Sequence, residues 1–166
     1  PYIWDSYEHQ QSALRGEAGN MLSKIILEET GVKVLDYYIQ GFRQVFTINK
    51  PVNTVDDLKG VKIRVPESPT YVNTFELLGS APTPVPFGET YTALETKVVG
   101  GLENTPETIF SSSMHEVVKY MNITDHISGP TTYSISNKVF TNLTEEQQNV
   151  LLEAAKEATS YGLDLT

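Results

Sequence analysis

Runs of β-branched and aromatic residues alternate with segments of helical periodicity along most of the chain. The runs at 32–39, 44–48 and 61–65 have the composition of strands, as do those at 117–123 and 131–136, and 81–85 is Pro-rich and extended. Between them, apolar residues recur at spacings of three and four in 6–30, 69–78 and 88–99, and again after 144. This alternation predicts an α/β fold.

Local signals mark where several of these helices begin and end. Thr144-Glu145-Glu146-Gln147 has the pattern of a capping box, and Ser68-Pro69 is typical of a helix start. Residues 54–57 predict a short capped helical turn. Gly16 and Gly19 interrupt the pattern of 6–30, so this segment is expected to form two short helices or one irregular helix.

The bulk composition limits the class of protein. The chain has 166 residues, of which 39% are hydrophobic and 20% charged, enough apolar material for a core and too little charge for a disordered chain. The formal net charge is −9, which argues against nucleic-acid binding, because that function requires clustered Lys and Arg. A small anionic ligand remains compatible, since the local charge of a cleft can oppose the global charge.

Two further features concern what the chain lacks and how it ends. There is no cysteine, so disulfides, thiolate zinc sites, iron–sulfur clusters and cysteine nucleophiles are excluded. No apolar run approaches the roughly 20 residues of a membrane span. Pro1-Tyr2-Ile3-Trp4 and Leu163-Asp164-Leu165-Thr166 both read as cuts through a longer chain, and we therefore expect a fragment.

The sequence offers no convincing catalytic or metal-binding constellation. The three histidines, His9, His115 and His126, do not have the i, i+4 spacing of a helical zinc pair, and each is expected to be a surface or hydrogen-bonding residue. There is no nucleophile elbow, Walker loop or dinucleotide fingerprint. The adjacent acid pairs do not face each other on a helix and are expected to be solvated. We predict no catalytic residue, no metal and no cofactor.

A different set of residues suits the binding of an anion. Arg64 lies mid-strand among apolar neighbours, and a guanidinium matches a carboxylate with two parallel hydrogen bonds. Asn104 precedes the helix start at Thr105-Pro106, and Phe87 lies in a turn that could wall a pocket. On pattern alone, Arg64 fits a surface salt bridge equally well, Asn104 fits a helix cap, and Phe87 fits an ordinary core aromatic.

Several blocks of sequence together resemble one family. They are G-F-R-Q at 41–44, T-V-D-D-L-K-G-V-K-I-R-V-P at 54–66, P-T-P-V-P-F-G-E-T-Y-T-A-L-E-T at 82–96 and G-G-L-E-N at 100–104. Their sequences and spacing are similar to those of the substrate-binding subunits of TRAP transporters (tripartite ATP-independent periplasmic transporters). The resemblance extends over almost the whole chain.

The resemblance implies a fold and a domain organisation. The fold would be α/β, a two-lobed arrangement like that of type II periplasmic binding proteins, which closes on its ligand like a hinged clamp. It would be incomplete here, because chains of this family are roughly twice as long. Residues 1–41 and 130–166 would form part of the first lobe, and residues 42–129 most of the second.

The resemblance also implies a site and a role for four residues. Arg64 would pair with the carboxylate of the substrate, Asn104 would contact the same region, and Phe87 would line the cleft. Arg43 is the nearest match to a second, upstream arginine of the family. The expected partners are a small carboxylate ligand (a C4-dicarboxylate, or an acidic sugar such as a uronate or sialic acid) and the membrane permease subunits of a TRAP transporter.

The expected function is therefore solute capture in the periplasm, with no enzymatic activity, no nucleic-acid partner and no membrane insertion. Two alternatives belong to other classes. One is a ligand-sensing domain of a signalling protein, and the other is an enzyme on a similar two-lobed scaffold, because fold alone does not fix function.

Overall fold

The chain divides into two compact units in a computed structural model that describes residues 1–163. The first unit is Phe42–Ile127, together with Pro1, and the second is Tyr2–Gly41 together with the chain from Ser128 onward. The last three residues, Asp164 to Thr166, on which part of the fragment interpretation rested, lie outside the described residues. The assignment of 1–41 and 130–166 to one lobe and 42–129 to another remains a prediction.

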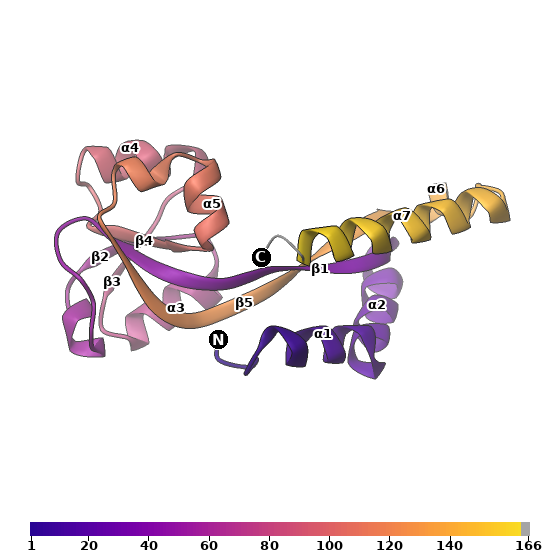
Figure 1. Cartoon of the computed structure of the whole chain (residues 1–166), viewed down its shortest axis with the longest axis horizontal. Coiled ribbons are helices and arrows are strands. Elements are labelled where there is room, and N and C mark those ends of the chain that lie inside the picture. Colours follow the sequence, from indigo (N-terminus) through magenta and orange to yellow (C-terminus); the bar gives the residue numbers. More distant parts are fainter. Residues whose placement is uncertain (164–166) are drawn as a thin grey trace. The chain divides into compact units, whose positions relative to one another are not determined.

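Two long strands pass from one unit to the other. The structure has a single strand β1 over Val32–Thr47 and a single strand β5 over Tyr120–Ser136 (Figure 1). The prediction of separate strands at 32–39 and 44–48, and at 117–123 and 131–136, was therefore wrong. Gly41 has φ 107°, a value that glycine tolerates because it has no Cβ, so the backbone stays extended through a stretch that looks like a break.

The first unit is built around the five-stranded sheet. Its other strands are β2 (Lys62–Val65), β3 (Ala81–Pro84) and β4 (Gly101–Asn104), and the strand order is β3-β2-β4-β1-β5. Strand β2 runs parallel to β3 and β4, whereas β1 is antiparallel to β4 with Gln44 opposite Asn104. Strand β4 was not predicted, because four residues that begin with glycine carry too little strand signal.

Helices cover both faces of this sheet (Figure 1). One face packs Val45, Ile63 and Phe75 into a core, with the short helix η1 (Val55–Leu58) and α3 (Pro69–Leu77). The other face buries Phe46 and Leu102 beneath α4 (Thr90–Glu95), α5 (Pro106–Ser111) and η3 (Met114–Glu116). The short helix η2 (Phe87–Glu89) leads into α4. The helix predicted over 88–99 is shorter than expected, because Lys97 takes a positive φ of 59°.

The second unit contains the remaining helices. The helix α1 (Tyr7–Arg15) ends at Gly16, and α2 (Glu17–Thr30) begins directly after it. Of the two predicted possibilities, two short helices or one irregular helix, the first is therefore correct. The short α6 (Asn137–Phe140) was not predicted, and α7 covers Glu145–Leu163. The predicted capping box at the start of α7 is present: the Thr144 backbone N–H donates to Gln147 Oε1, and the Gln147 N–H donates to Thr144 Oγ1.

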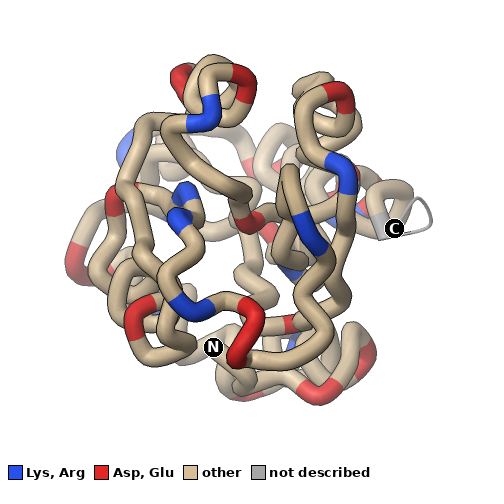
Figure 2. Tube along the Cα trace, turned by 90° about the vertical axis from the view of Figure 1, so that its left-hand side faces the viewer, with Lys and Arg blue, Asp and Glu red and all other residues tan. Residues whose placement is uncertain are grey.

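The α/β class predicted from the alternation of elements is confirmed by these two units. Among the described residues, no helix has both the length and the apolar character needed to cross a membrane. Basic segments are scattered between acidic ones along the described trace and form no continuous stripe (Figure 2).

Candidate functional site

The four predicted site residues come together at one edge of the sheet in the first unit. Strands β2, β3 and β4 are parallel, so their carboxyl ends meet at this edge. The pairing of Gln44 with Asn104 brings the neighbouring Arg43 of β1 to the same edge, and Phe87 follows shortly after β3. The carboxyl ends of the strands are where open α/β sheets usually bind ligands.

Arg64 is buried and has no acidic partner. Its residue is 3% exposed, and its guanidinium donates from Nε (2.9 Å) and Nη2 (2.6 Å) to the carbonyl oxygen of Val85. These bonds fix the guanidinium but leave Nη1 and one N–H of Nη2 without a partner among the described residues. The alternative interpretation of Arg64 as a member of a surface salt bridge is therefore wrong.

Phe87 lies beside this guanidinium. The Cζ atom of Arg64 is 5.9 Å from the centroid of the Phe87 ring, within the range of a cation–π interaction. The ring is 46% exposed, so Phe87 is not an ordinary core aromatic. The structure thus places an aromatic wall next to the free edge of the arginine.

Asn104 is the last residue of β4 and is 5% exposed. Its Oδ1 accepts a hydrogen bond from the backbone N–H of Thr105 at 2.9 Å, and its Nδ2 has no hydrogen-bond partner among the described residues. Thr105, not Asn104, is the N-cap of α5, so the capping interpretation of Asn104 was wrong. The amide nitrogen therefore keeps accessible, unused N–H donors, which are suited to an anionic or carbonyl oxygen.

Arg43, in contrast, already has a carboxylate. Its Nε lies 2.5 Å from Oε2 of Glu103, its Nη2 lies 2.7 Å from Oε1, and Nη2 also donates to the Glu103 carbonyl at 3.1 Å. This is a bidentate pair, with the Glu103 side chain fully buried and the Arg43 side chain 14% exposed. The guanidinium also lies 5.1 Å above the ring centroid of Tyr71.

His126 extends this pair into a network that the sequence did not reveal. Its Nε2 lies 3.3 Å from Oε2 of Glu103, and its Nδ1 lies 2.9 Å from Oγ1 of Thr124. The imidazole is fully buried and meets the ring of Phe75 edge-on at 5.2 Å. His126 was expected to be either a surface residue or a hydrogen-bonding residue. It is not at the surface, and it does form hydrogen bonds.

Strand alternation places the two arginines on opposite faces of the sheet. Arg64 lies opposite Leu102 in the strand pairing, and Leu102 belongs to the core beneath α4. Glu103 follows Leu102 and therefore points to the other face, where it meets Arg43. The free guanidinium and the paired one thus approach the same edge from two sides.

Burial and charge act differently on the two groups. Burial lowers the pKa of Arg64, with Glu103 opposing this shift and Arg43 adding to it. Burial would also lower the pKa of Arg43, but the hydrogen bonds and charge of Glu103 outweigh it and raise that pKa. Both guanidiniums remain charged, because arginine side chains are not deprotonated in proteins. The net effect is an unneutralised positive charge at Arg64.

The described residues form no cluster of metal ligands at this edge. Among residues 1–163, no group of three or more His, Asp or Glu side chains is arranged to hold a metal ion. The one buried acid at the edge, Glu103, is occupied by Arg43 and His126. The arrangement is therefore suited to binding an anion in a fixed orientation.

Comparison with known proteins gives one family. The whole chain, residues 1–166, matches the family "Bacterial extracellular solute-binding protein, family 7". Over 161 residues it is 37% identical to the 2,3-diketo-L-gulonate-binding periplasmic protein of Escherichia coli K12, a match that covers 97% of this chain and 49% of that protein. The chain spans about half the length of the curated relatives that it matches.

Solved structures of TRAP periplasmic solute-binding proteins have the same fold as this chain. A TRAP periplasmic solute-binding protein from Sulfitobacter sp. NAS-14.1 with bound β-D-galacturonate gives a TM-score of 0.93 at 37% identity, covering 99% of this chain and 55% of that one. A TRAP protein from Roseobacter denitrificans OCh 114 with bound L-galactonate gives 0.90 at 33% identity, with the same coverage.

These findings confirm the resemblance and the incomplete two-lobed fold that it implied. The family and the matching structures are described as solute-binding proteins and not as enzymes. The chain belongs to family 7 of the bacterial extracellular solute-binding proteins, the family of the TRAP periplasmic binding proteins.

Proposed function

We propose that this chain forms part of a periplasmic binding protein that captures a small carboxylate for a TRAP-type secondary transporter. The observation that carries the proposal is the guanidinium of Arg64, which is buried and held in place but has no carboxylate partner. Arg64 would pair with the acid group of the ligand, Asn104 would donate to the same group, and Phe87 would line the cleft.

The argument rests on the cost of an unpaired charge. Removing a charged group from water is unfavourable by several kcal/mol unless a partner compensates it. The Val85 carbonyl compensates one side of the Arg64 guanidinium with partial charge only. A ligand carboxylate at the remaining Nη1–Nη2 edge would supply the missing negative charge and two parallel hydrogen bonds.

Arg43 takes a supporting role in this proposal. Because its fork is filled by Glu103, it would not offer the ligand a second bidentate site; its Nη1 is the one nitrogen without a hydrogen bond among the described residues. Its charge adds to the positive potential at the edge, as the effect on the pKa of Arg64 indicates. We infer that Arg43, Glu103 and His126 hold this end of the sheet in position.

The ligand class follows from the relatives. Those reported above bind diketogulonate, galacturonate and galactonate, all of which are sugar acids. We propose a small carboxylate as the ligand: an acidic sugar such as a uronate or sialic acid, or a C4-dicarboxylate. Periplasmic localisation and delivery to membrane permease subunits belong to the same proposal.

The test is isothermal titration of the whole protein against a panel of organic acids. Arg64→Ala is expected to weaken the best ligand by about two to four orders of magnitude, the effect of about 3–5 kcal/mol for a desolvated charge pair. Lys62→Ala is the matched control, because Lys62 is an exposed cation on the same strand. Unchanged affinity in Arg64→Ala would remove Arg64 from the site and with it the basis of the proposal.

A further inference from the structure

The segment 81–86 of the first unit has a proline at every second position. These are Pro82, Pro84 and Pro86, and the first two lie in strand β3. A proline ring fixes its own φ at about −65° and also keeps the residue before it out of the α region, so each proline restricts two residues. The alternating prolines therefore restrict all of 81–86 to an extended backbone before any tertiary contact forms.

Val85 lies between the last two of these prolines, and its carbonyl oxygen holds Arg64. Both Nε (2.9 Å) and Nη2 (2.6 Å) of Arg64 donate to this oxygen, and no other described residue accepts a hydrogen bond from the guanidinium. The direction of the Val85 carbonyl therefore sets the direction in which the free Nη1–Nη2 edge of Arg64 points.

The backbone is held on both sides of this carbonyl. The Val85 N–H donates to the Val65 carbonyl at 3.3 Å, at the end of the pairing between β2 and β3. The Pro86 carbonyl accepts a hydrogen bond from the Glu89 N–H at 3.0 Å and another from the Thr90 hydroxyl at 3.2 Å. Pro86 has φ −53° and ψ 145°, an extended conformation that suits the proline ring. The Val85 carbonyl thus has little freedom to turn.

Protection of the sheet edge explains only some of these prolines. Strand β3 is the last strand of the sheet, and the N–H groups of Ala81 and Val85 point inward to β2. By alternation, the N–H groups of positions 82 and 84 would point outward, where a foreign strand could pair, and proline has none. This role accounts for Pro82 and Pro84 but not for Pro86, which lies beyond the strand.

We propose that Pro84 and Pro86 are positioning residues for carboxylate binding: they fix the Val85 carbonyl, which holds the guanidinium of Arg64 in the orientation that a ligand carboxylate requires. This inference rests on the proposed function, in which Arg64 pairs with that carboxylate. Binding is weaker when a contacting group must first be ordered, and a backbone that is restricted in advance avoids this loss. Pro86 also precedes Phe87, the aromatic wall beside Arg64.

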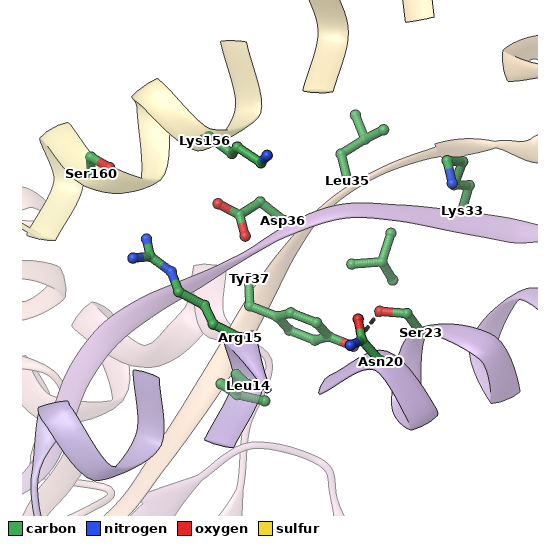
Figure 3. Close-up of a pocket in the computed structure, with 11 residues that line it drawn as sticks. Leu14, Arg15, Asn20, Ser23, Lys33, Leu35, Asp36, Tyr37, Lys156 and Ser160 are labelled. Carbon is green, nitrogen blue, oxygen red and sulfur yellow. Dashed lines mark hydrogen bonds between the residues drawn. The ribbon is translucent and has the colours of Figure 1, made fainter. Parts of the chain in front are cut away.

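The first experiment follows hydrogen exchange of the arginine Nε–H groups by NMR in the whole ligand-free protein. In Pro84→Ala/Pro86→Ala, the Arg64 Nε–H is expected to exchange at least about tenfold faster than in the wild type, because the backbone that carries its acceptor is no longer restricted. Arg64→Lys identifies the resonance. The Nε–H of Arg15, a residue of the second unit whose side chain Figure 3 shows, is the internal reference and should exchange equally in every variant.

Two controls separate this effect from other causes. Pro82→Ala also adds an outward N–H to β3 but leaves the residues around Val85 restricted, so the exchange of Arg64 should stay unchanged. The Nε–H of Arg43, which is bonded to Glu103, reports on general opening of the first unit and should also stay unchanged. Pro86→Ala alone adds no N–H to the strand and should accelerate the exchange of Arg64.

The second experiment is calorimetric titration of the same variants with D-galacturonate, the sugar acid of the related Sulfitobacter structure. Pro84→Ala/Pro86→Ala is expected to weaken binding by about three- to tenfold, although no residue that contacts the carboxylate has changed. Pro82→Ala should bind as the wild type does. In the Arg64→Lys background the double change should weaken binding less, because lysine has no planar fork for the Val85 carbonyl to hold.

Three results would overturn the proposal. The first is unchanged exchange of the Arg64 Nε–H in Pro84→Ala/Pro86→Ala, and the second is an acceleration that Pro82→Ala or the Arg43 Nε–H shares equally. The third is unchanged affinity for D-galacturonate despite faster exchange. Failure of the proposed function looks different: Arg64→Ala would bind D-galacturonate as the wild type does, whatever the prolines do to the exchange of Arg64.

Discussion

Arg43 and Arg64 lie at the same edge of one sheet, yet their surroundings are opposite. Arg43 has a full carboxylate partner in Glu103, which in turn contacts His126. Arg64 is even less exposed but has only the Val85 carbonyl to accept its hydrogen bonds. The difference separates an arginine that is paired within the protein from one that, in our proposal, is available to a ligand.

The comparison also explains why residue type alone could not assign these roles. Both arginines lie within strands, and both can form a bidentate pair with a carboxylate. What distinguishes them is strand alternation, which turns Glu103 toward the face of Arg43 and away from that of Arg64. The role of each arginine therefore follows from the register of β4 against its two neighbours.

The largest expected difference between the two arginines is in stability. Arg43→Met leaves Glu103 buried without its guanidinium and is expected to lower the free energy of unfolding by about 3–5 kcal/mol. Arg64→Met loses two hydrogen bonds to Val85 but also removes a buried unpaired charge, so its effect is expected to stay within about 1 kcal/mol. Urea unfolding of the whole ligand-free protein measures both.

Two further variants sharpen this measurement. The double variant Arg43→Met/Glu103→Leu is expected to recover part of the loss, because replacing both members of a buried pair leaves no uncompensated charge. Lys119→Met, at an exposed basic residue of the same unit, serves as the control. Equal destabilisation by Arg43→Met and Arg64→Met would contradict the division of roles.

The sequence predicts much of the fold because most element boundaries carry local signals. The capping box at Thr144 and the break at Gly16 both appear where predicted. The long strand β1 was missed as a continuous element because Gly41 and the polar residues around it resemble a turn, and β5 was missed because Gly129-Pro130 does. Only pairing with neighbouring strands keeps such a segment extended, and pairing is not a local property.

The candidate site shows the same limit. Arg64 stands out as a charged residue between apolar neighbours, Asn104 directly precedes the helix start at Thr105-Pro106, and Phe87 lies in a marked turn. Glu103 carried a usable signal, since a buried strand containing an acid must supply it with a partner, and Arg43 was available. His126 carried none, because its contacts with Glu103 and Phe75 join residues far apart in the chain.

A smaller effect on ligand affinity is expected when Arg64 is replaced by lysine, which keeps the positive charge but not the planar guanidinium. Lysine cannot hold the Val85 carbonyl and also present two parallel donors to a carboxylate. Arg64→Lys is therefore expected to weaken the ligand by about 10- to 100-fold, less than Arg64→Ala does. Arg43→Lys should change the affinity less than Arg64→Lys, because its carboxylate is Glu103. Calorimetric titration measures both affinities. A larger loss of affinity in Arg43→Lys than in Arg64→Lys would show that Arg43, and not Arg64, binds the carboxylate of the ligand.

The smallest expected effect concerns the aromatic wall beside Arg64. Phe87→Leu keeps an apolar side chain but removes the ring 5.9 Å from the Arg64 guanidinium, so affinity is expected to fall by about 0.5–1 kcal/mol, or roughly two- to fivefold. The ring is 46% exposed, so unfolding should hardly change. Phe110→Leu is the matched control, since Phe110 is 73% exposed and stacks on His115. If both substitutions weaken ligand binding equally, the effect does not arise from the contact with Arg64. Phe87 would then not be part of the binding site.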